Sequence, residues 1–174
     1  MTLVQWIVAL VALQRVAELV HARRNAAWLI AQGGVEAGAG HYPIMVLLHA
    51  AWLAALFFFV PADAPIIWWL LALFVLLQAG RVWVLITLGR FWTTRIITLP
   101  DAPLISGGPY RFCRHPNYAI VAAEIAILPL AFGAWEIALL FSLLNGLLLL
   151  YRIRMEDAVL SPRRAEGGRR GHPG

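Results

Sequence analysis

Residues 116–153, PNYAIVAAEIAILPLAFGAWEIALLFSLLNGLLLLYRI, decide the fold of this chain. They hold two apolar segments, at 116–132 and 134–153, with little more than Gly133 between them. A helix that spans a membrane needs about 20 mostly apolar residues. The stretch therefore predicts two spanning helices joined as a tight antiparallel hairpin.

Three further apolar segments precede this hairpin, at residues 3–20, 43–60 and 65–88. The chain of 174 residues is 61% hydrophobic, against roughly 45–50% for an ordinary soluble domain. We therefore predict an all-α integral membrane protein with five transmembrane helices. Residues 1–160 are expected to form a single membrane-embedded domain, and residues 161–174 a disordered basic tail.

The placement of the arginines predicts how these helices are oriented. The 14 strongly basic residues are all arginines, and they lie in the gaps at 21–42 and 89–115, near the adjoining helix ends and in the tail. The opposite side carries Asp63 and Glu136 and no arginine. Because positively charged loops stay in the cytoplasm, we expect the N-terminus outside and the C-terminus inside, in a bacterial inner membrane. The net charge of +5 does not indicate nucleic acid as a partner, since the arginines flank spans and do not share one soluble face.

The connector between the third and fourth segments contains the run GGPYRFCRHPNY at residues 107–118. Its Gly-Gly-Pro start permits a tight turn, and Pro116 stands where a helix begins, so that His115 caps a positive helix end. Such an end favours an anionic group, and Tyr110 and Tyr118 can flank a planar base or a cation. We interpret the run as a cytoplasmic cofactor-binding connector. The alternative is that its arginines only anchor the chain and its tyrosines belong to an interfacial belt.

A second cluster of polar residues lies toward the end of the fifth segment. Asn145, Arg152 and Glu156 fall on one helical face. Glu156 and Asp157 stand at a helix end where the macrodipole disfavours carboxylates. Either a bound ligand holds these acids there, or Glu156 forms a solvated pair with Arg152.

Glu124 lies about two turns into the fourth segment. Ionisable side chains inside a membrane are costly and frequently functional, so Glu124 is a candidate catalytic residue. The alternative is a structural ion pair with Arg15 or Arg81.

The sequence predicts no metal site, because its histidines do not have a metal-ligand spacing. The single cysteine, Cys113, excludes an internal disulfide. Nothing in the sequence indicates an oligomeric state.

Taken together, the run at 107–118 and the later Arg152, Glu156 and Asp157 resemble the isoprenylcysteine carboxyl methyltransferase family. The family pattern is Gly-x-Tyr, then Arg-His-Pro-x-Tyr, a hydrophobic helical hairpin, then Arg-x-x-x-Glu-Glu. The resemblance covers residues 85–160, and Asp157 replaces the second glutamate. It implies an integral-membrane methyltransferase that uses S-adenosylmethionine.

The resemblance also implies roles for individual residues. Arg152 would hold the carboxylate or phenolate of the methyl acceptor, and Glu124 or His115 could serve as base for a phenol or enol. Arg95 lies where the family has another cofactor contact. The residues implied to bind the cofactor are Ala102, Pro103, Leu104, Ile105, Tyr110, His115, Pro116, Asn117, Tyr118 and Glu156.

The methyl acceptor implied by the resemblance is a lipophilic small molecule or a prenylated substrate that enters sideways from the bilayer. It carries either an isoprenylcysteine-like carboxylate or the hydroxyl group of an alkylpyrone or phenolic lipid. Two other classes of protein stay open. One is a non-enzymatic membrane transport or assembly protein, and the other is a membrane reductase of the sterol type that uses NADPH.

Overall fold

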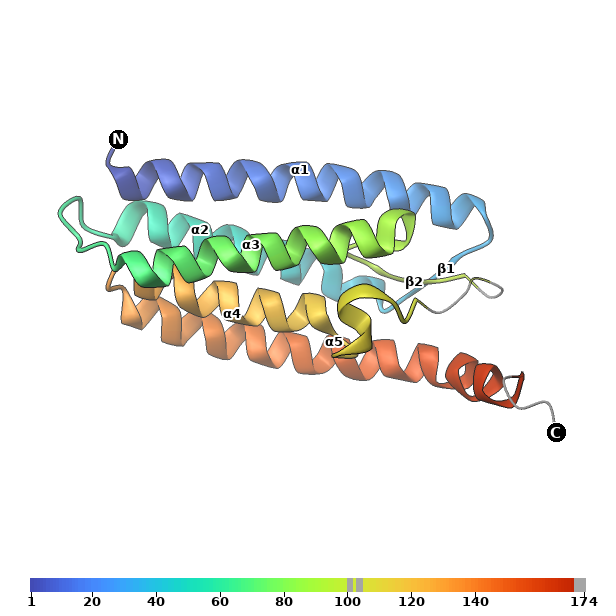
Figure 1. Cartoon of the computed structure of the whole chain (residues 1–174). Helices are drawn as coiled ribbons and strands as arrows, with labels where there is room; N and C mark the ends of the chain where they lie inside the picture. Colours follow the sequence, from blue (N-terminus) through green and yellow to red (C-terminus); the bar gives the residue numbers. More distant parts are fainter. Residues whose placement is uncertain (100–101, 103–104, 171–174) are drawn as a thin grey trace.

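The computed structural model of the chain describes residues 1–99, 102 and 105–170, with the backbone alone at 39 and 160–170. Its five α-helices run side by side as one elongated bundle, with the N-terminus and the end of the last helix at opposite ends (Figure 1). The helices are α1 (Leu3–Ala31), α2 (Tyr42–Phe59), α3 (Trp68–Leu88), α4 (Pro116–Ala131) and α5 (Trp135–Arg170).

Four of these helices are long and apolar enough to cross a membrane, namely α1, α2, α3 and α5. The fourth helix in the chain, α4, has 16 residues and is therefore about 24 Å long, short of the roughly 30 Å of a hydrocarbon core. Many large apolar side chains on the outside of the bundle are exposed, such as Leu10, Phe59 and Leu147. This outer surface suits lipid and not water.

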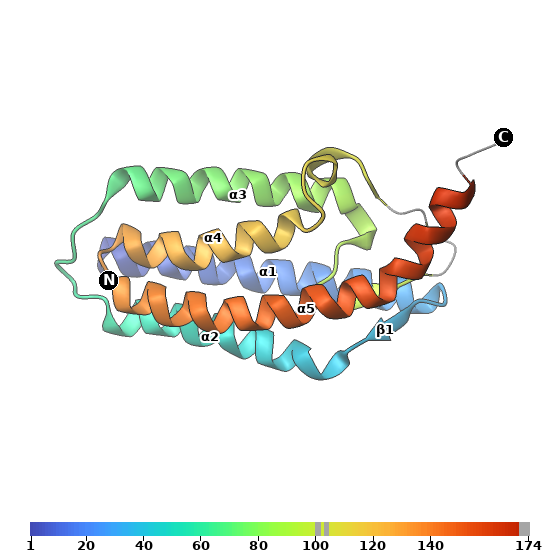
Figure 2. The ribbon, with the colours of Figure 1, turned by 90° about the horizontal axis from the view of Figure 1, so that it is seen from below.

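Helix α4 packs against both α3 and α5, and Figure 2 shows it between them. Gly133, with a φ of 70°, turns the chain between α4 and α5 in a conformation that favours glycine. The predicted hairpin of the fourth and fifth segments is thus present. An apolar core fills the end of the bundle near the N-terminus, where Val8, Leu56 and Leu128 are fully buried.

Helix α1 is longer than the apolar segment that predicts it. A capping box between Thr2 and Gln5 starts it, and it continues through His21, Arg23 and Arg24 to Ala31. No residue between 21 and 31 breaks a helix, and Ala22 and Leu29 are buried on its inner face.

A small sheet departs from the all-α prediction. Strand β1 (Val35–Ala37) pairs antiparallel with β2 (Ile96–Thr98), with Val35 opposite Thr98. β1 lies in the glycine-rich segment 31–40. The β-branched residues of β2 suit a strand, but their partner is about 60 positions away, and only the fold brings the two together.

Helix α5 extends beyond the apolar segment 134–153 that predicts it and continues to Arg170. The domain boundary at residue 160 and the disordered tail from residue 161 stay predictions. Residues 171–174 lie outside the described part of the chain.

Two carboxylates and two arginines form an ion cluster inside the bundle. Arg81 binds both oxygens of Glu18, at 2.7 Å each, and its Nη1 lies 3.1 Å from Glu124. Arg15 lies 2.9 Å from Glu18 and 2.8 Å from Glu124, and Gln78 donates to Glu124 at 2.8 Å. The four charges cancel, so the cluster ties α1, α3 and α4 together without leaving an unpaired charge.

Candidate active site

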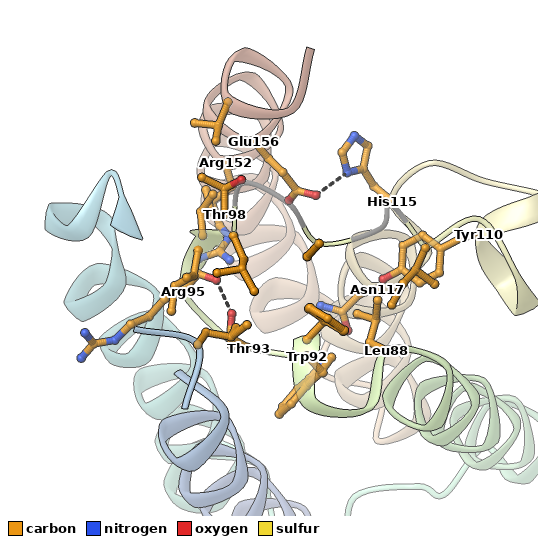
Figure 3. Close-up of a pocket in the computed structure, with 18 of the residues that line it drawn as sticks. Leu88, Trp92, Thr93, Arg95, Thr98, Tyr110, His115, Asn117, Arg152 and Glu156 are labelled. Atoms are coloured by element: carbon orange, nitrogen blue, oxygen red, sulfur yellow. Dashed lines mark hydrogen bonds and ion pairs between the residues drawn. The ribbon is translucent and has the colours of Figure 1, made fainter. Parts of the chain in front are cut away.

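A cavity of about 410 Å³ lies where the connector 89–115 meets α4 and α5 (Figure 3). We name it the connector cavity. Strand β2 forms one wall. The start of α4 and the part of α5 that is predicted to face the cytoplasm form two others. Its polar lining residues are Thr93, Arg95, Thr98, Ser106, Tyr110, Arg114, His115, Asn117, Tyr118, Arg152 and Glu156.

The turn at residues 107–111 brings Tyr110 to this cavity. Gly108 has a φ of 57°, and a Cβ at this position would lie 2.5 Å from Thr87 Oγ1. The 3₁₀ turn η3 (Gly108–Arg111) can therefore close onto α3 only with glycine there. Burial, together with the nearby Glu156 carboxylate, raises the pKa of Tyr110, so its hydroxyl stays a proton donor.

The start of α4 faces the stretch of α5 around Glu156 across the connector cavity. Pro116 is the first residue of α4 and His115 its cap, as predicted. The Tyr118 hydroxyl donates to Glu156 Oε2 at 2.5 Å. His115 Nδ1 lies 3.6 Å from Glu156 Oε1, and its Nε2 lies 3.5 Å from Asp157. Glu156 and Asp157 therefore lie inside α5, which continues to Arg170, and not at a helix end as the sequence predicts. Their partners, His115 and Tyr118, stand at the positive N-terminal end of α4.

Arg152 lies deep in the same site, with 4% of its surface exposed. Its Nη2 donates to the Thr94 carbonyl at 3.0 Å, its Nη1 lies 3.3 Å from the Met45 sulfur, and its guanidinium lies 5.5 Å from the Tyr118 ring centroid. Across the described residues, no carboxylate is within ion-pair distance of it. It can therefore hold an anionic oxygen from a ligand.

A second cavity, of about 350 Å³, lies inside the bundle and is mostly apolar. We name it the bundle cavity. Leu19, Val46, Leu53, Val121 and Leu148 are among the apolar residues that line it. Its polar lining includes His49 and Asn145. Five residues line both cavities, namely Trp92, Thr93, Asn117, Tyr118 and Arg152. One wall therefore separates a polar site from an apolar one.

Several buried polar atoms around these cavities have no protein partner. Within the described part of the chain, Trp92 Nε1, Asn117 Oδ1 and Asn145 Oδ1 make no hydrogen bond. Trp92 and Asn145 are 2% and 1% exposed. Buried polar atoms are nearly always satisfied in proteins, so these three atoms are candidates for contact with ligands.

The structure assembles most of the predicted site. Ala102, Ile105, Tyr110, His115, Asn117, Tyr118, Arg152 and Glu156 all line the connector cavity. Pro116 is buried nearby but does not line it, and Pro103 and Leu104 lie outside the described residues. Arg95 lines the cavity, but its guanidinium points away from it in Figure 3, to Glu36 at 3.0 Å and over the Tyr42 ring.

Glu124 lies apart from this assembly. It lines neither cavity, and Arg15, Arg81 and Gln78 occupy its carboxylate. The structure thus gives it the ion pairs that the alternative interpretation predicts.

Sequence reasoning does not single out Trp92, Thr93 or His49. Trp92 and Thr93 are residues of an irregular connector, and no periodic pattern marks them. Asn145 can be identified from the sequence, because its spacing from Arg152 places the two residues on one face of a helix.

Comparison with known proteins identifies the family of the chain. A model of the isoprenylcysteine carboxyl methyltransferase (ICMT) family matches residues 70–162. An uncharacterized protein of Bacillus subtilis (strain 168), YpbQ, is 37% identical over 158 residues, which are 88% of this chain and 94% of that protein. No solved structure matches the chain. The matched region holds most of α3, all of α4, α5 as far as residue 162, and the whole motif set. We conclude that the chain belongs to the isoprenylcysteine carboxyl methyltransferase family.

Proposed function

We propose that the protein is an integral-membrane, S-adenosylmethionine-dependent O-methyltransferase whose acceptor carries a lipid tail. The observation that carries this proposal is the shared wall of the two cavities. The polar connector cavity, which would take the soluble cofactor, and the apolar bundle cavity, which would take the lipid, share Asn117, Tyr118 and Arg152. Membership of the family supports the reaction type.

The residues of the connector cavity fit this cofactor. A zwitterion with a sulfonium charge needs both cationic and anionic partners, and Arg114 and Glu156 both line the cavity. The Tyr110 and Tyr118 rings can face a cation or a planar base. The unpartnered Trp92 Nε1 and Asn117 Oδ1 offer one donor and one acceptor. The bound cofactor would supply an electrophilic methyl group on sulfur.

The residues of the chain would then position the acceptor and exclude water. Arg152 would bind the reacting oxygen, because a guanidinium pairs with a carboxylate or phenolate through two N–H groups. A carboxylate is ionised at neutral pH and needs no base, so alignment in a water-poor site accounts for the catalysis. An isoprenylcysteine-like carboxylate and a phenolic or alkylpyrone hydroxyl both suit this arrangement.

The orientation follows from the same proposal. The end of the bundle that holds the connector cavity would face the cytoplasm, where the cofactor is made, with the N-terminus on the other side. The acceptor would enter the bundle cavity sideways from the bilayer.

Calorimetry with S-adenosylmethionine on the detergent-purified protein tests the proposal. We expect binding at about micromolar strength in the wild type, and its loss in Glu156→Ala and in His115→Ala. Glu136→Ala is the matched control, because Glu136 is exposed at the opposite end of α5. A folded wild type that binds NADPH and not S-adenosylmethionine would instead favour a reductase, and one that binds neither would remove the enzyme proposal.

A further inference from the structure

The bundle cavity holds two polar side chains that the proposed function does not use. His49 lies on α2 and Asn145 on α5, and both line this cavity together with Arg152. A purely apolar lipid tail needs neither of them. Asn145 is 1% exposed, and its Oδ1 has no partner among the described residues. Leaving a buried polar atom unpaired costs free energy, so this position suits a polar group on the ligand.

The imidazole of His49 has a defined tautomer. Its Nδ1 lies 2.9 Å from the Met45 carbonyl oxygen, and a carbonyl oxygen can only accept a hydrogen bond. Nδ1 therefore carries a proton, and in the neutral ring Nε2 keeps a lone pair that needs a donor. Met45 also contacts the Arg152 guanidinium through its sulfur, at 3.3 Å, so His49 lies one helical turn from a direct neighbour of Arg152.

Asn145 adds a second demand. Its Oδ1 makes no hydrogen bond to the described residues, and its side chain is 1% exposed. An Oδ1 atom accepts a hydrogen bond from a donor. Both His49 and Asn145 thus present acceptor atoms, on a wall where Arg152 presents donors.

The other charged groups on this cavity are already compensated. The titratable residues that face it from the elements around His49 are Arg15, Glu18, Arg81, Tyr118 and Arg152. Arg15 and Arg81 are paired with Glu18 and Glu124. Arg152 is left as the cation for an acceptor oxygen.

We propose that His49 and Asn145 form a site for an acceptor with a hydroxyl group, and that His49 takes the proton of that hydroxyl. This proposal rests on the proposed function and narrows its acceptor to a phenol or enol with a lipid tail. A carboxylate has no proton to give to these two acceptor atoms. A phenol with a reference pKa near 10 needs a base at neutral pH, and a second hydroxyl on its ring could reach Asn145.

The chemical step conserves atoms and electrons. A lone pair of the acceptor oxygen forms the new bond to the methyl carbon, and the bond from that carbon to sulfur breaks. Its electron pair stays on sulfur, which becomes a neutral thioether. The hydroxyl proton passes to His49 Nε2 and later to water, and Arg152 stabilises the oxygen while its charge is negative.

Two probe acceptors of equal tail length, a long-chain alkylresorcinol and a long-chain alkyl carboxylate, test this proposal. We expect the wild type to methylate the alkylresorcinol, and His49→Gln to lower that rate by about 100-fold or more. The methylation rate of the His49→Gln variant should also keep rising with pH toward the pKa of the phenol. The rate of the wild type should instead reach a plateau once His49 is unprotonated. A change in this profile would not follow from a merely structural role.

Asn145→Leu is the second variant, because it keeps the volume of the side chain and removes its polar atoms. We expect it to weaken binding of the alkylresorcinol to the cofactor-free protein about 10-fold, measured by calorimetry. Asp63→Asn is the control, since Asp63 is exposed and lines neither cavity.

The outcomes separate this proposal from the proposed function. A wild type that binds S-adenosylmethionine but methylates only the carboxylate, or neither probe, overturns the hydroxyl proposal alone. Folded His49→Gln and Asn145→Leu variants that behave as the wild type does would overturn it equally. Absence of S-adenosylmethionine binding by the folded wild type would overturn the proposed function itself.

Discussion

At the scale of single residues, Arg152 has the most demanding position. It is buried, it lines both cavities, and it donates to the Thr94 carbonyl and contacts the Met45 sulfur. No carboxylate among the described residues pairs with it, so its charge is available to an anionic oxygen of a ligand. Lysine carries the same charge but has no planar pair of donors.

Arg152→Lys should therefore lower kcat/KM for methyl transfer by about 10- to 100-fold, since small misplacements at a reacting centre cost about that much. The measurement is methyl-label transfer to the acceptor, with cofactor affinity followed in parallel. Arg154→Lys is the control, because Arg154 is exposed two residues further along α5. Near-normal turnover in Arg152→Lys would remove the two-donor role.

At the scale of elements, the turn η3 depends on one glycine. Gly108→Ala would introduce a methyl group against Thr87 at a positive φ, and such strain costs about 1–3 kcal/mol. We expect this variant to displace Tyr110 and to weaken S-adenosylmethionine binding by about tenfold. Gly107→Ala is a close control, because nothing lies within 4 Å of its added Cβ. Equal cofactor affinity in the two variants would contradict the argument.

The ion cluster gives a second prediction at this scale. Glu124→Ala leaves Arg15 and Arg81 short of one carboxylate inside the bundle, and loss of one partner from a buried pair costs about 3–5 kcal/mol. Thermal unfolding in detergent should show a markedly lower Tm, while the folded fraction still methylates its acceptor. If the Tm is unchanged and turnover is lost, Glu124 acts in the reaction and not in the fold.

At the scale of the whole molecule, the N-terminus and the end of α5 lie at opposite ends of the bundle (Figure 1). The single cysteine, Cys113, is exposed at the end that holds the connector cavity. We expect a membrane-impermeant maleimide to label Cys113 in inside-out vesicles and not in intact spheroplasts. In the Cys113→Ser background, Asp63→Cys should give the reverse pattern. The same labelling pattern for both positions would exclude the proposed topology.

The sequence alone is sufficient to predict the five helices and several of the residues that line the connector cavity. Long apolar runs define α2, α3 and α5, and the motif at 107–118 and its partner Glu156 meet in one cavity. The sheet of β1 and β2 could not be predicted, because a strand of three residues is too short to show an alternating hydrophobic pattern. The two strands also lie about 60 positions apart in the sequence. The bundle cavity could not be predicted for a similar reason, since His49 and Trp92 acquire their setting only from packing.

The ion cluster has a consequence for how the chain enters the bilayer during synthesis. α1 brings its own counter-charge, because Arg15 and Glu18 are one turn apart and 2.9 Å from each other. Arg81 of α3 and Glu124 of α4 are made about 40 residues apart, and each alone would meet lipid as an uncompensated charge. α3 and the short α4 are therefore expected to leave the translocation channel as one unit, while α1 can leave it alone.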